Sequence, residues 1–414
     1  MNPRAFIVTG LGFGDCGKGT VTDALSRRFD ARLVVRFNGG AQAGHNVVLP
    51  DGRHHTFAQF GAGTFVEGVR THLASHVVVH PTALAVEADY LARGGVHDAL
   101  SRLTADPRCL VTTPYHQAAG RLRERLSGHG TCGVGVGETV RDALAHADDA
   151  LRLGALHGAG EQLERIRVRL LESLPSDIAK DTDGSMLQDA SVAQRWLDVV
   201  CAMPLRLAPD EEVAHAHRDH SIVFEGAQGI LLDEHHGFHP HTTWSTCTAR
   251  NALHWLRDSP HQVERVGVLR STLTRHGAGP LPSESAELSA QLPEPHNSSA
   301  GWQGSFRVGW FDPVLLRYAI KANGGVDWLA LTHVDRVQER FVEGYGFELI
   351  ALTAPEGSAE RLDQQSALTR ALSLAVPTLA TVPGGDFADW VERTLGAPVG
   401  VSSHGPTHTD KRWR

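Results

Sequence analysis

The sequence is poor in cysteine, and it lacks long apolar runs. It holds only five cysteines among 414 residues, and no two of them form a CxxC pair. An odd number of scattered cysteines argues against a disulfide framework or a structural zinc site, and it favours a reducing compartment. No apolar run is long enough to cross a bilayer, and no signal-peptide pattern opens the sequence. We therefore predict a cytoplasmic protein without a membrane partner.

An excess of positive charge is also missing. Lysine and arginine total 39 against 47 aspartates and glutamates, which gives a net charge of −8 with histidine neutral. Such a chain has no general basic field to attract nucleic acid, so we expect no nucleic-acid partner. Any anionic substrate must then be held by local groups.

Apolar segments of strand length alternate with helical patterns along the chain. The strand-like segments are residues 5–10, 221–226, 265–271, 326–335 and 347–353. This alternation predicts an α/β fold with a P-loop-like, mostly parallel central sheet flanked by helices. We expect one domain over residues 1–414, with a helical insertion at roughly 139–203 and a binding loop at roughly 277–306, a stretch rich in Pro, Ser and Gly.

The stretch "GLGFGDCGKGT" at residues 10–20 lies between a predicted strand and a predicted helix. Backbone N–H groups of such a glycine turn, together with the helix dipole and Lys18, favour a bound phosphate. A P-loop would carry Ser or Thr where Gly19 stands, and Asp15 lies inside the turn. A carboxylate among phosphates is repelled unless it holds Mg²⁺ or takes a proton from a substrate. The loop therefore suggests a reaction that activates an oxygen by phosphorylating it.

A second segment, "VVRFNGGAQAGHNVV" at residues 34–48, contains His45. Its small residues permit close approach of the backbone to a ligand. On the residues alone, His45 is either an acid that stabilises a reacting group or a satisfied structural histidine.

The motifs "FGDCGKGT" and "AQAGHN" resemble the opening motifs of the adenylosuccinate synthetase family. The resemblance continues in the family's order through "VFEGAQGILLDEHHG", "GAGPLPSE", "RVGWFDPVLLRYAIKANG", "LALTHVD" and "SSHGPTHT". It implies an enzyme that uses GTP and Mg²⁺ to join IMP and aspartate. In that reaction a base removes the N1 proton of the purine, O6 attacks the γ-phosphate, and an amine displaces the phosphoryl group.

The resemblance also implies roles for individual residues. Asp15 would be the base and a metal contact, His45 the acid that stabilises the transferring phosphoryl group, and Asp23 the acid that orients His45. Lys18 would contact phosphate, the Gly44 carbonyl the metal, and Gln228 the oxygen region of the purine. The residues implied for GTP binding are Gly14, Gly17, Lys18, Gly19, Thr20, His333, Asp335, Ser403, Gly405 and Pro406. Those implied for acceptor binding are Gln42, Thr131, Gln228 and Thr243. Asp335 can accept from N1–H and the 2-amino group of guanine; the alternative is a helix-capping acid.

The loop that binds aspartate in the family departs from the pattern here. Its residues would be Ser299, Ala300, Trp302, Gln303 and Arg307. Gly304, Ser305 and Phe306 stand where the family has arginines, and arginine forks are how a site grips a dicarboxylate. We therefore expect an amine partner other than L-aspartate.

Two further departures affect the acceptor side. Val134 takes the place of an arginine in "GTCGVGVGE", so either the monophosphate of IMP is held more weakly or the acceptor is another lactam. The histidines in "DEHHGFHPH" resemble a family segment with a single histidine, which makes a metal site there the less favoured interpretation. The resemblance also implies a homodimer.

Three alternatives remain beside an altered ligase. They are an ordinary adenylosuccinate synthetase with a divergent loop, a GTP-binding regulator without turnover, and a kinase that stops at the phosphorylated acceptor.

Overall fold

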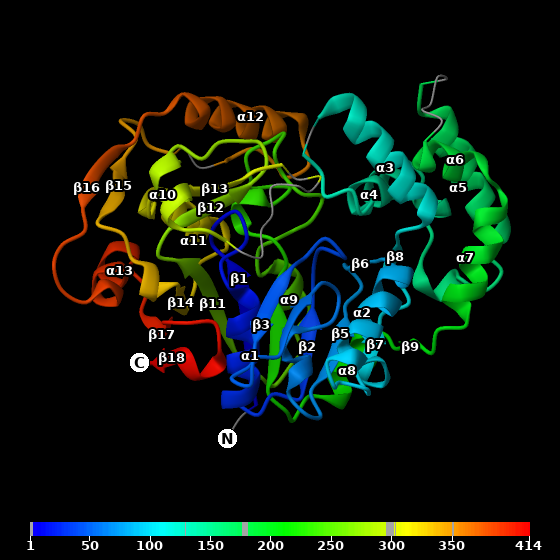
Figure 1. Ribbon diagram of the computed structural model, residues 1–414, viewed down its shortest axis with the longest axis horizontal. Helices are drawn as coiled ribbons and strands as arrows, with labels where there is room; N and C mark the ends of the chain where they lie inside the picture. The colour runs from blue at the N-terminus through cyan, green and yellow to red at the C-terminus, as the bar shows by residue number, and fades with distance from the viewer. Residues whose placement is uncertain (1–2, 129, 176–180, 295–301, 303, 350–351) are drawn as a thin grey trace.

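A ten-stranded sheet forms the centre of the computed structural model of the chain (Figure 1). The structure describes residues 3–128, 130–175, 181–294, 302, 304–349 and 352–414. In spatial order the strands are β18 (Lys411–Trp413), β17 (Val399–Ser403), β14 (Trp328–Thr332), β11 (Gln262–Arg270), β1 (Arg4–Gly10), β10 (Ile222–Glu225), β2 (Leu33–Arg36), β5 (Arg70–Leu73), β7 (Leu103–Ala105) and β9 (Arg206–Leu207). All neighbours pair in parallel except β18, which is antiparallel to β17. The predicted fold class is confirmed.

Strand β1 is buried on both faces, as its continuous apolar sequence predicts. Phe6 and Val8 pack on one face with Val21 and Leu25 of helix α1 (Lys18–Arg28). Ala5 and Ile7 belong to a separate cluster on the other face, together with side chains of α8 (Asp210–Ala216) and α9 (Arg250–Trp255). The glycine loop between β1 and α1 thus projects from the most buried part of the sheet.

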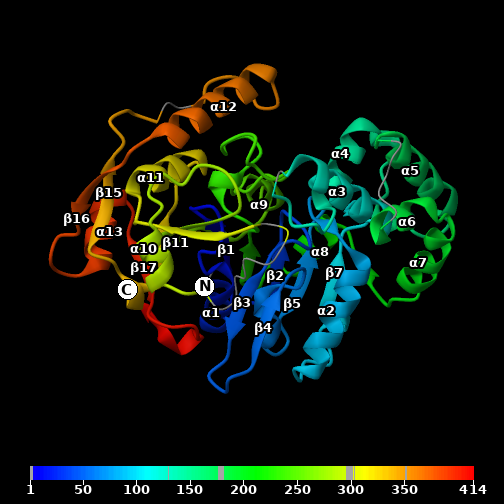
Figure 2. The ribbon, with the colours of Figure 1, turned by 45° about the horizontal axis from the view of Figure 1, so that its top comes forward.

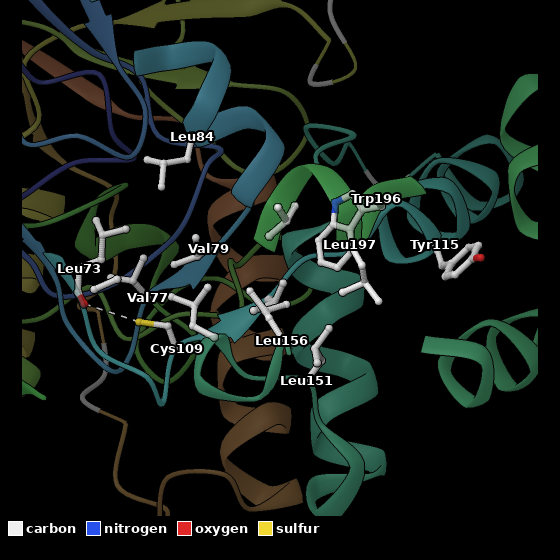
Figure 3. Close-up of a cluster of buried hydrophobic side chains, with 14 of the residues drawn as sticks. Leu73, Val77, Val79, Leu84, Cys109, Tyr115, Leu151, Leu156, Trp196 and Leu197 are labelled. Atoms are coloured by element: carbon white, nitrogen blue, oxygen red, sulfur yellow. Dashed lines mark hydrogen bonds between the residues drawn. The ribbon is translucent and has the colours of Figure 1, made fainter. Parts of the chain in front are cut away.

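A group of helices lies beyond the β9 end of the sheet (Figures 1 and 2). It contains α3 (Pro114–Ser127), α4 (Val136–Ala145), α5 (Gly160–Glu172), α6 (Thr182–Gln188) and α7 (Ser191–Cys201). Tyr115, Trp196 and Leu197 pack there in one core with Leu84 of α2 (Pro81–Arg93) (Figure 3). Helix α3, which precedes the stretch expected to be inserted, belongs to the same packing unit.

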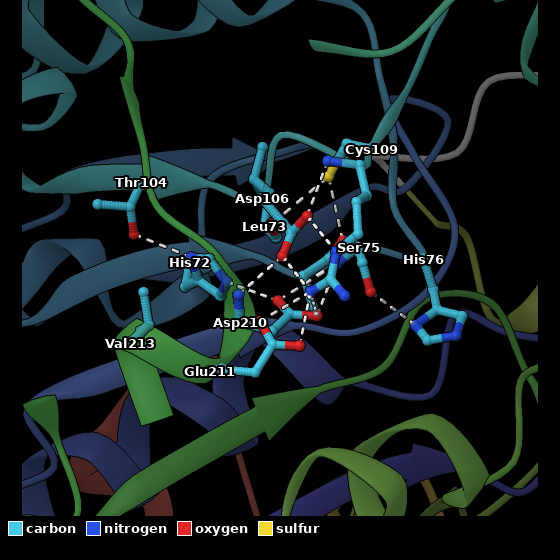
Figure 4. Close-up of polar contacts among 12 residues, drawn as sticks. His72, Leu73, Ser75, His76, Thr104, Asp106, Cys109, Asp210, Glu211 and Val213 are labelled. Carbon is cyan, nitrogen blue, oxygen red and sulfur yellow. Dashed lines mark hydrogen bonds and ion pairs between the residues drawn. The ribbon is translucent and has the colours of Figure 1, made fainter. Parts of the chain in front are cut away.

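A buried polar network anchors the chain where it returns from these helices to the sheet (Figure 4). The ring of His72 on β5 bonds through Nδ1 to Thr104 Oγ1 at 3.0 Å and through Nε2 to Asp210 Oδ1 at 2.8 Å. Asp106 accepts a hydrogen bond from the Asp210 backbone N–H at 2.7 Å and from Arg108. Strands β5 and β7 are thereby tied to the start of α8.

The remaining elements surround the other end of the sheet and the glycine loop. They are α10 (Ala286–Gln291), α11 (Pro313–Ala322), α12 (Ala359–Leu374), α13 (Phe387–Leu395) and the two-stranded pairs β12 (Leu273–His276) with β13 (Phe306–Gly309), β15 (Arg340–Gly344) with β16 (Thr378–Thr381), β3 (His45–Val48) with β4 (His54–Phe57), and β6 (Val78–Val79) with β8 (Leu110–Val111). Among the residues that the structure describes, no helix is long and apolar enough to span a membrane. All five cysteines are free.

Two local expectations need correction. The described part of residues 347–353 is not a strand; the strand is β15, which ends before a turn at Gly346 with φ 76°. The expected irregular loop at 277–306 contains helix α10, which begins because Ser285 caps it by accepting from the Leu288 N–H.

Candidate active site

The loops that follow β1, β10, β14 and β17 meet at one edge of the sheet, where they line a cavity of about 810 Å³. Ligands of open parallel sheets bind at this carboxyl edge. The structure brings together most of the residues singled out from the sequence: Gly14, Asp15, Gly17, Lys18, Gly19, Thr20, Gln42, Gly44, His45, Thr131, Gln228, Thr243, His333, Asp335, Ser403, Gly405 and Pro406.

The glycine loop is interlocked with the loop that follows β10. A Cβ atom on Gly229 would lie 2.1 Å from the Gly12 carbonyl oxygen, so only glycine fits there. The buried Lys18 ammonium donates to the Gln228 carbonyl oxygen at 2.5 Å and to Cys16 Sγ at 3.9 Å, which leaves one of its three N–H donors for a phosphate. The loop is therefore held in shape before any ligand arrives.

Backbone strain gathers at this cavity. Among the described residues, four other than glycine have a positive φ, and three of them line the cavity: Asp15 at 48°, Gln228 at 54° and His333 at 56°. Left-handed conformations cost free energy in non-glycine residues and collect at functional sites. The backbone thus points to the same place as the motifs.

The Asp15 carboxylate faces the cavity without a partner. No hydrogen bond or ion pair joins this carboxylate to another described residue, whereas Arg270 Nη1 donates to the Asp15 backbone carbonyl at 3.1 Å. A carboxylate of this kind is available to accept a substrate proton or to bind a cation.

His45 lies on β3, and its ring is paired with a second buried acid. Nδ1 lies 2.6 Å from Oε1 of Glu225, while the other Glu225 oxygen accepts from the Ala62 N–H at 2.9 Å. His45 is 6 % exposed and Glu225 is 0 % exposed. Burial lowers the pKa of His45 to about 4, against the opposing effect of Glu225. Burial alone would raise the pKa of Glu225, but the His45 ring and Arg36 hold it below its usual value. The pair is therefore a neutral imidazole that donates from Nδ1 to an ionised carboxylate.

The predicted role of Asp23 as the acid that orients His45 is wrong in this structure. Both Asp23 oxygens accept from Arg27 Nε, at 3.0 and 3.1 Å, and His408 Nδ1 lies 3.7 Å away. One helical turn separates Asp23 from Arg27 on α1, so this local pair forms readily. The sequence analysis missed Glu225. The sequence feature that could have identified Glu225 is a carboxylate inside the apolar strand segment "SIVFEG", because a fully buried acid requires a partner.

The predicted base-binding residues lie where β14 and β17 end. His333 bonds to Thr332 Oγ1 at 2.8 Å, and burial, followed by the charges of Arg270 and Arg336, holds its pKa well below the usual value. Thr20 Oγ1 donates to the Pro406 carbonyl at 2.9 Å. The turn at residues 403–406 is thereby attached to the first turn of α1.

The acceptor side of the cavity is formed by α3, α4 and the turn between them. Beside Gln42, Thr131 and Thr243, it contains two acids that the sequence analysis did not single out. Glu124 accepts from the Gly130 and Thr131 N–H groups at 2.6 and 3.1 Å. Glu138 accepts from Arg123 Nε with both oxygens at 3.1 Å.

The side expected to receive the amine differs most from the expectation. Arg307 does not line the cavity; it donates to the carbonyls of Gly277 and Gly279 at 2.7 and 2.8 Å and pairs with Glu284. The Trp302 ring lies near the guanidinium groups of Arg121 and Arg125, at 5.9 and 5.7 Å. Ser299, Ala300 and Gln303 lie outside the described residues.

Every lysine and arginine known to line the cavity already has an acceptor in the chain. Arg275 donates to the carbonyls of Ala278, Pro280 and His241. The other pairings are Lys18 with the Gln228 carbonyl, Arg123 and Arg141 with Glu138, Arg270 with Glu294, and Arg336 with Glu294 and Asp335. The described wall of the cavity therefore presents no uncommitted arginine fork.

The donor set suits Mg²⁺. Asp15 and Gly44 line the same cavity, and across the described ranges no cluster of three or more His, Cys, Asp or Glu is arranged to hold a metal by itself. Mg²⁺ commonly binds through one or two carboxylates, waters and substrate phosphates, so a single free carboxylate beside a phosphate loop fits this ion.

Comparisons with known proteins agree with this geometry. A family model described as Adenylosuccinate synthetase matches residues 7–344. The adenylosuccinate synthetase of Mycobacterium leprae is 33 % identical over 345 residues, which cover 80 % of this chain and 77 % of the relative. The chain belongs to the adenylosuccinate synthetase family. The predicted enzyme class, a GTP-dependent ligase that forms a C–N bond, is confirmed at the level of this family.

Other members of the family extend the likeness over the whole chain. The adenylosuccinate synthetase of Saccharopolyspora erythraea is 30 % identical over 411 residues, covering 95 % of this chain and 89 % of the relative. The fully ligated Plasmodium falciparum adenylosuccinate synthetase superposes with a TM-score of 0.76 at 20 % identity, covering 99 % of each chain. The cyanophage S-2L succinoaminodeoxyadenylate synthetase, bound to dGMP and dATP as an energy donor, superposes with a TM-score of 0.63 at 18 % identity, covering 100 % of this chain and 96 % of that one. At these identities the two structures show a shared fold.

Proposed function

We propose that this member of the family phosphorylates a lactam oxygen of an IMP-like purine nucleotide with GTP and then replaces the phosphoryl group with an amine other than L-aspartate. The observation that carries the phosphoryl chemistry is the unpartnered Asp15 carboxylate on the same cavity as His45 and the interlocked glycine loop. Phosphoryl transfer depends mainly on positioning and charge neutralisation, which such a site supplies.

Asp15 takes the proton from the lactam nitrogen, so that negative charge develops on the purine oxygen, and that oxygen attacks the γ-phosphorus. His45 stands ready to stabilise the transferring group. In its neutral form Nδ1 donates to Glu225, and Nε2 has no partner among the described residues. Approach of the negative phosphoryl group raises the pKa of the ring, and the Glu225 carboxylate offsets the charge of the imidazolium. Bound Mg²⁺, held by Asp15 and the Gly44 carbonyl, would supply further charge neutralisation.

In the second step the amine attacks the carbon that carries the phosphorylated oxygen, a C–N bond forms, the C–O bond breaks, and inorganic phosphate leaves with that oxygen. A dicarboxylate amine needs cationic donors, and those of the described wall are already engaged. Residues 295–301 and 303 read Pro-His-Asn-Ser-Ser-Ala-Gly and Gln, so they add neither lysine nor arginine. A weakly charged or neutral amine is the partner that this composition favours.

The second candidate is an ordinary adenylosuccinate synthetase, which joins IMP and aspartate in purine biosynthesis. The names of its sequence relatives favour it. The fold neighbour that binds dGMP and dATP shows that this architecture also accommodates other nucleotides. Homodimer formation and a cytoplasmic location stay predictions.

An assay without any amine tests the first step. GTP labelled with ¹⁸O in the β-nonbridging positions scrambles its label when its γ-phosphoryl group is transferred reversibly, so IMP and Mg²⁺ should promote scrambling. Absence of scrambling and of phosphate release with every lactam tried would favour the regulator without turnover, and a stable phosphorylated acceptor would favour the kinase.

Mass spectrometry of complete reactions tests the second step. We expect poor formation of adenylosuccinate from GTP, IMP and aspartate, and efficient formation of another 6-substituted product from a panel of neutral and monocarboxylate amines. Efficient adenylosuccinate formation would contradict the proposed change of amine.

A further inference from the structure

Lys411 is a buried cation that the chemistry described above does not use. The chain has four lysines, at positions 18, 180, 321 and 411, among 39 basic residues. Lys18 and Lys411 are 3 % and 8 % exposed, whereas Lys321 is exposed on α11. Burial of an ammonium group is costly unless its donors are satisfied, so Lys411 requires a structural or functional reason.

Lys411 lies on β18, directly opposite Ser403 of β17. Its Nζ reaches back over the turn that connects the two strands and donates to the carbonyls of Gly405 and Thr407, at 3.1 and 2.7 Å. No carboxylate lies within ion-pairing distance of Nζ among the described residues, although Asp23, Asp335 and Asp410 act on it over longer distances. The ammonium group of Lys411 therefore hydrogen-bonds to backbone carbonyls of a single turn.

That turn forms a wall of the cavity through Ser403, Gly405 and Pro406. The Gly405 carbonyl accepts from two donors, because Ser403 Oγ also bonds to it at 3.0 Å. Both lone pairs of this oxygen are therefore occupied. Pro406 contributes no N–H, and its own carbonyl is taken by Thr20 Oγ1. The Gly405 carbonyl is therefore withdrawn from the 6-amino group of adenine, and the Pro406 carbonyl keeps one lone pair.

Asp335 lines the same cavity just after β14, the strand next to β17, and its carboxylate can accept from the N1–H and 2-amino groups of guanine. The two features are complementary in effect: Asp335 accepts from guanine, and the turn withholds the Gly405 carbonyl from adenine. Selection between related ligands commonly uses both an attractive and a repulsive element.

We propose that Lys411 is a specificity-determining residue, which shapes the turn at residues 403–407 and withdraws the Gly405 carbonyl so that the donor site takes guanine rather than adenine nucleotides. The inference rests on the proposed function, because it assigns the donor base to this wall.

The test compares GDP and ADP binding to the full chain by isothermal titration calorimetry in the presence of Mg²⁺. We expect Lys411→Met to raise the Kd for GDP about tenfold and to reduce the preference for GDP over ADP by a similar factor, equivalent to the loss of one or two hydrogen bonds. Lys321→Met is the matched control, since it removes the same charge from an exposed position, and both of its Kd values should stay unchanged. IMP affinity should be the same in all three proteins.

A second variant protects the test against a folding defect. Thr20→Val removes the other bond to the same turn, at Pro406. Because loss of a Thr20 contact with phosphate would affect GDP and ADP alike, the preference for GDP over ADP is the readout, and it should fall even if Lys411→Met does not fold. Wild-type protein that binds neither GDP nor GTP would overturn the proposed donor site itself. Wild-type binding of GDP with an unchanged Kd and an unchanged GDP-to-ADP ratio in Lys411→Met would overturn only the role of Lys411. If Lys411→Met does not fold, an unchanged GDP-to-ADP ratio in Thr20→Val would overturn selection by this turn and with it the role of Lys411.

Discussion

The two sides of the cavity differ in whether their ionisable groups already have a partner in the protein. On the side of the glycine loop, the Asp15 carboxylate and His45 Nε2 have no partner in the described chain. On the opposite side, Arg123 and Arg275 are hydrogen-bonded to an acid and to carbonyls of the protein, and Arg141 is ion-paired with Glu138 at 3.6 Å. A group that must act on a ligand has no partner in the protein, whereas a group that is already paired with the protein stabilises the wall of the cavity. This difference underlies our proposal that the phosphoryl chemistry of the family is retained and that the amine partner differs from L-aspartate.

The largest effect should come from Asp15. Asp15→Asn removes the base while it preserves size, so amine-free isotope scrambling in GTP should fall about 10³-fold, within the range for general base catalysis. GTP affinity should stay within about tenfold, because the lysine and the glycine loop remain. Scrambling above a tenth of the wild-type rate would show that the open carboxylate is not the base.

The next effect separates the two acids near His45. Glu225→Gln should lower the scrambling rate about 10²-fold, because the amide cannot offset an imidazolium charge. Asp23→Asn serves as the control and should change the rate by less than about threefold, since Asp23 is bonded to Arg27. The reverse order of effects would restore Asp23 as the partner of His45 during turnover.

A smaller effect is expected on the amine side, where an uncommitted cation can be introduced. Ser305→Arg places a guanidinium group at an exposed position where the resemblance to the family predicts arginine. We expect the kcat/KM for aspartate to rise about tenfold, which corresponds to about 1.4 kcal/mol. Ser305→Gln, similar in length but uncharged, should leave it unchanged. Equal gains from both variants would point to packing rather than charge.

The smallest effect concerns stability and pH. The pKa of His45 is about 4 in the folded protein, below the ordinary value of 6.5. The unfolded chain therefore binds a proton first as the pH falls, and this contribution to the free energy of unfolding is present above pH 6.5 and is lost progressively toward pH 4. Urea unfolding of His45→Gln and wild type between pH 7 and pH 4.5 should show a difference that narrows with acidification. A difference that is constant with pH would show that His45 is not held neutral.

The sequence was sufficient to predict those features that depend on local pattern. The apolar run at β1, the glycine turn after it and the strands with polar residues at their carboxyl ends place Asp15, Gln228, Asp335 and Ser403 at one edge of a parallel sheet. What the sequence could not show are pairings between distant segments. Glu225 and His45 are 180 residues apart, and Arg307 finds its carbonyl partners only after residues 277–279 fold over it. Such choices depend on tertiary packing, which no local spacing records.

The left-handed residues carry a consequence for engineering. Substitution of glycine for Asp15, Gln228 or His333 would relieve an unfavourable backbone conformation and so raise stability, but each substitution would also delete a group at the reaction centre. Asp30 has a φ of 46° and does not line the cavity. Of these four residues, Asp30 is the one at which glycine could raise stability without a loss of activity.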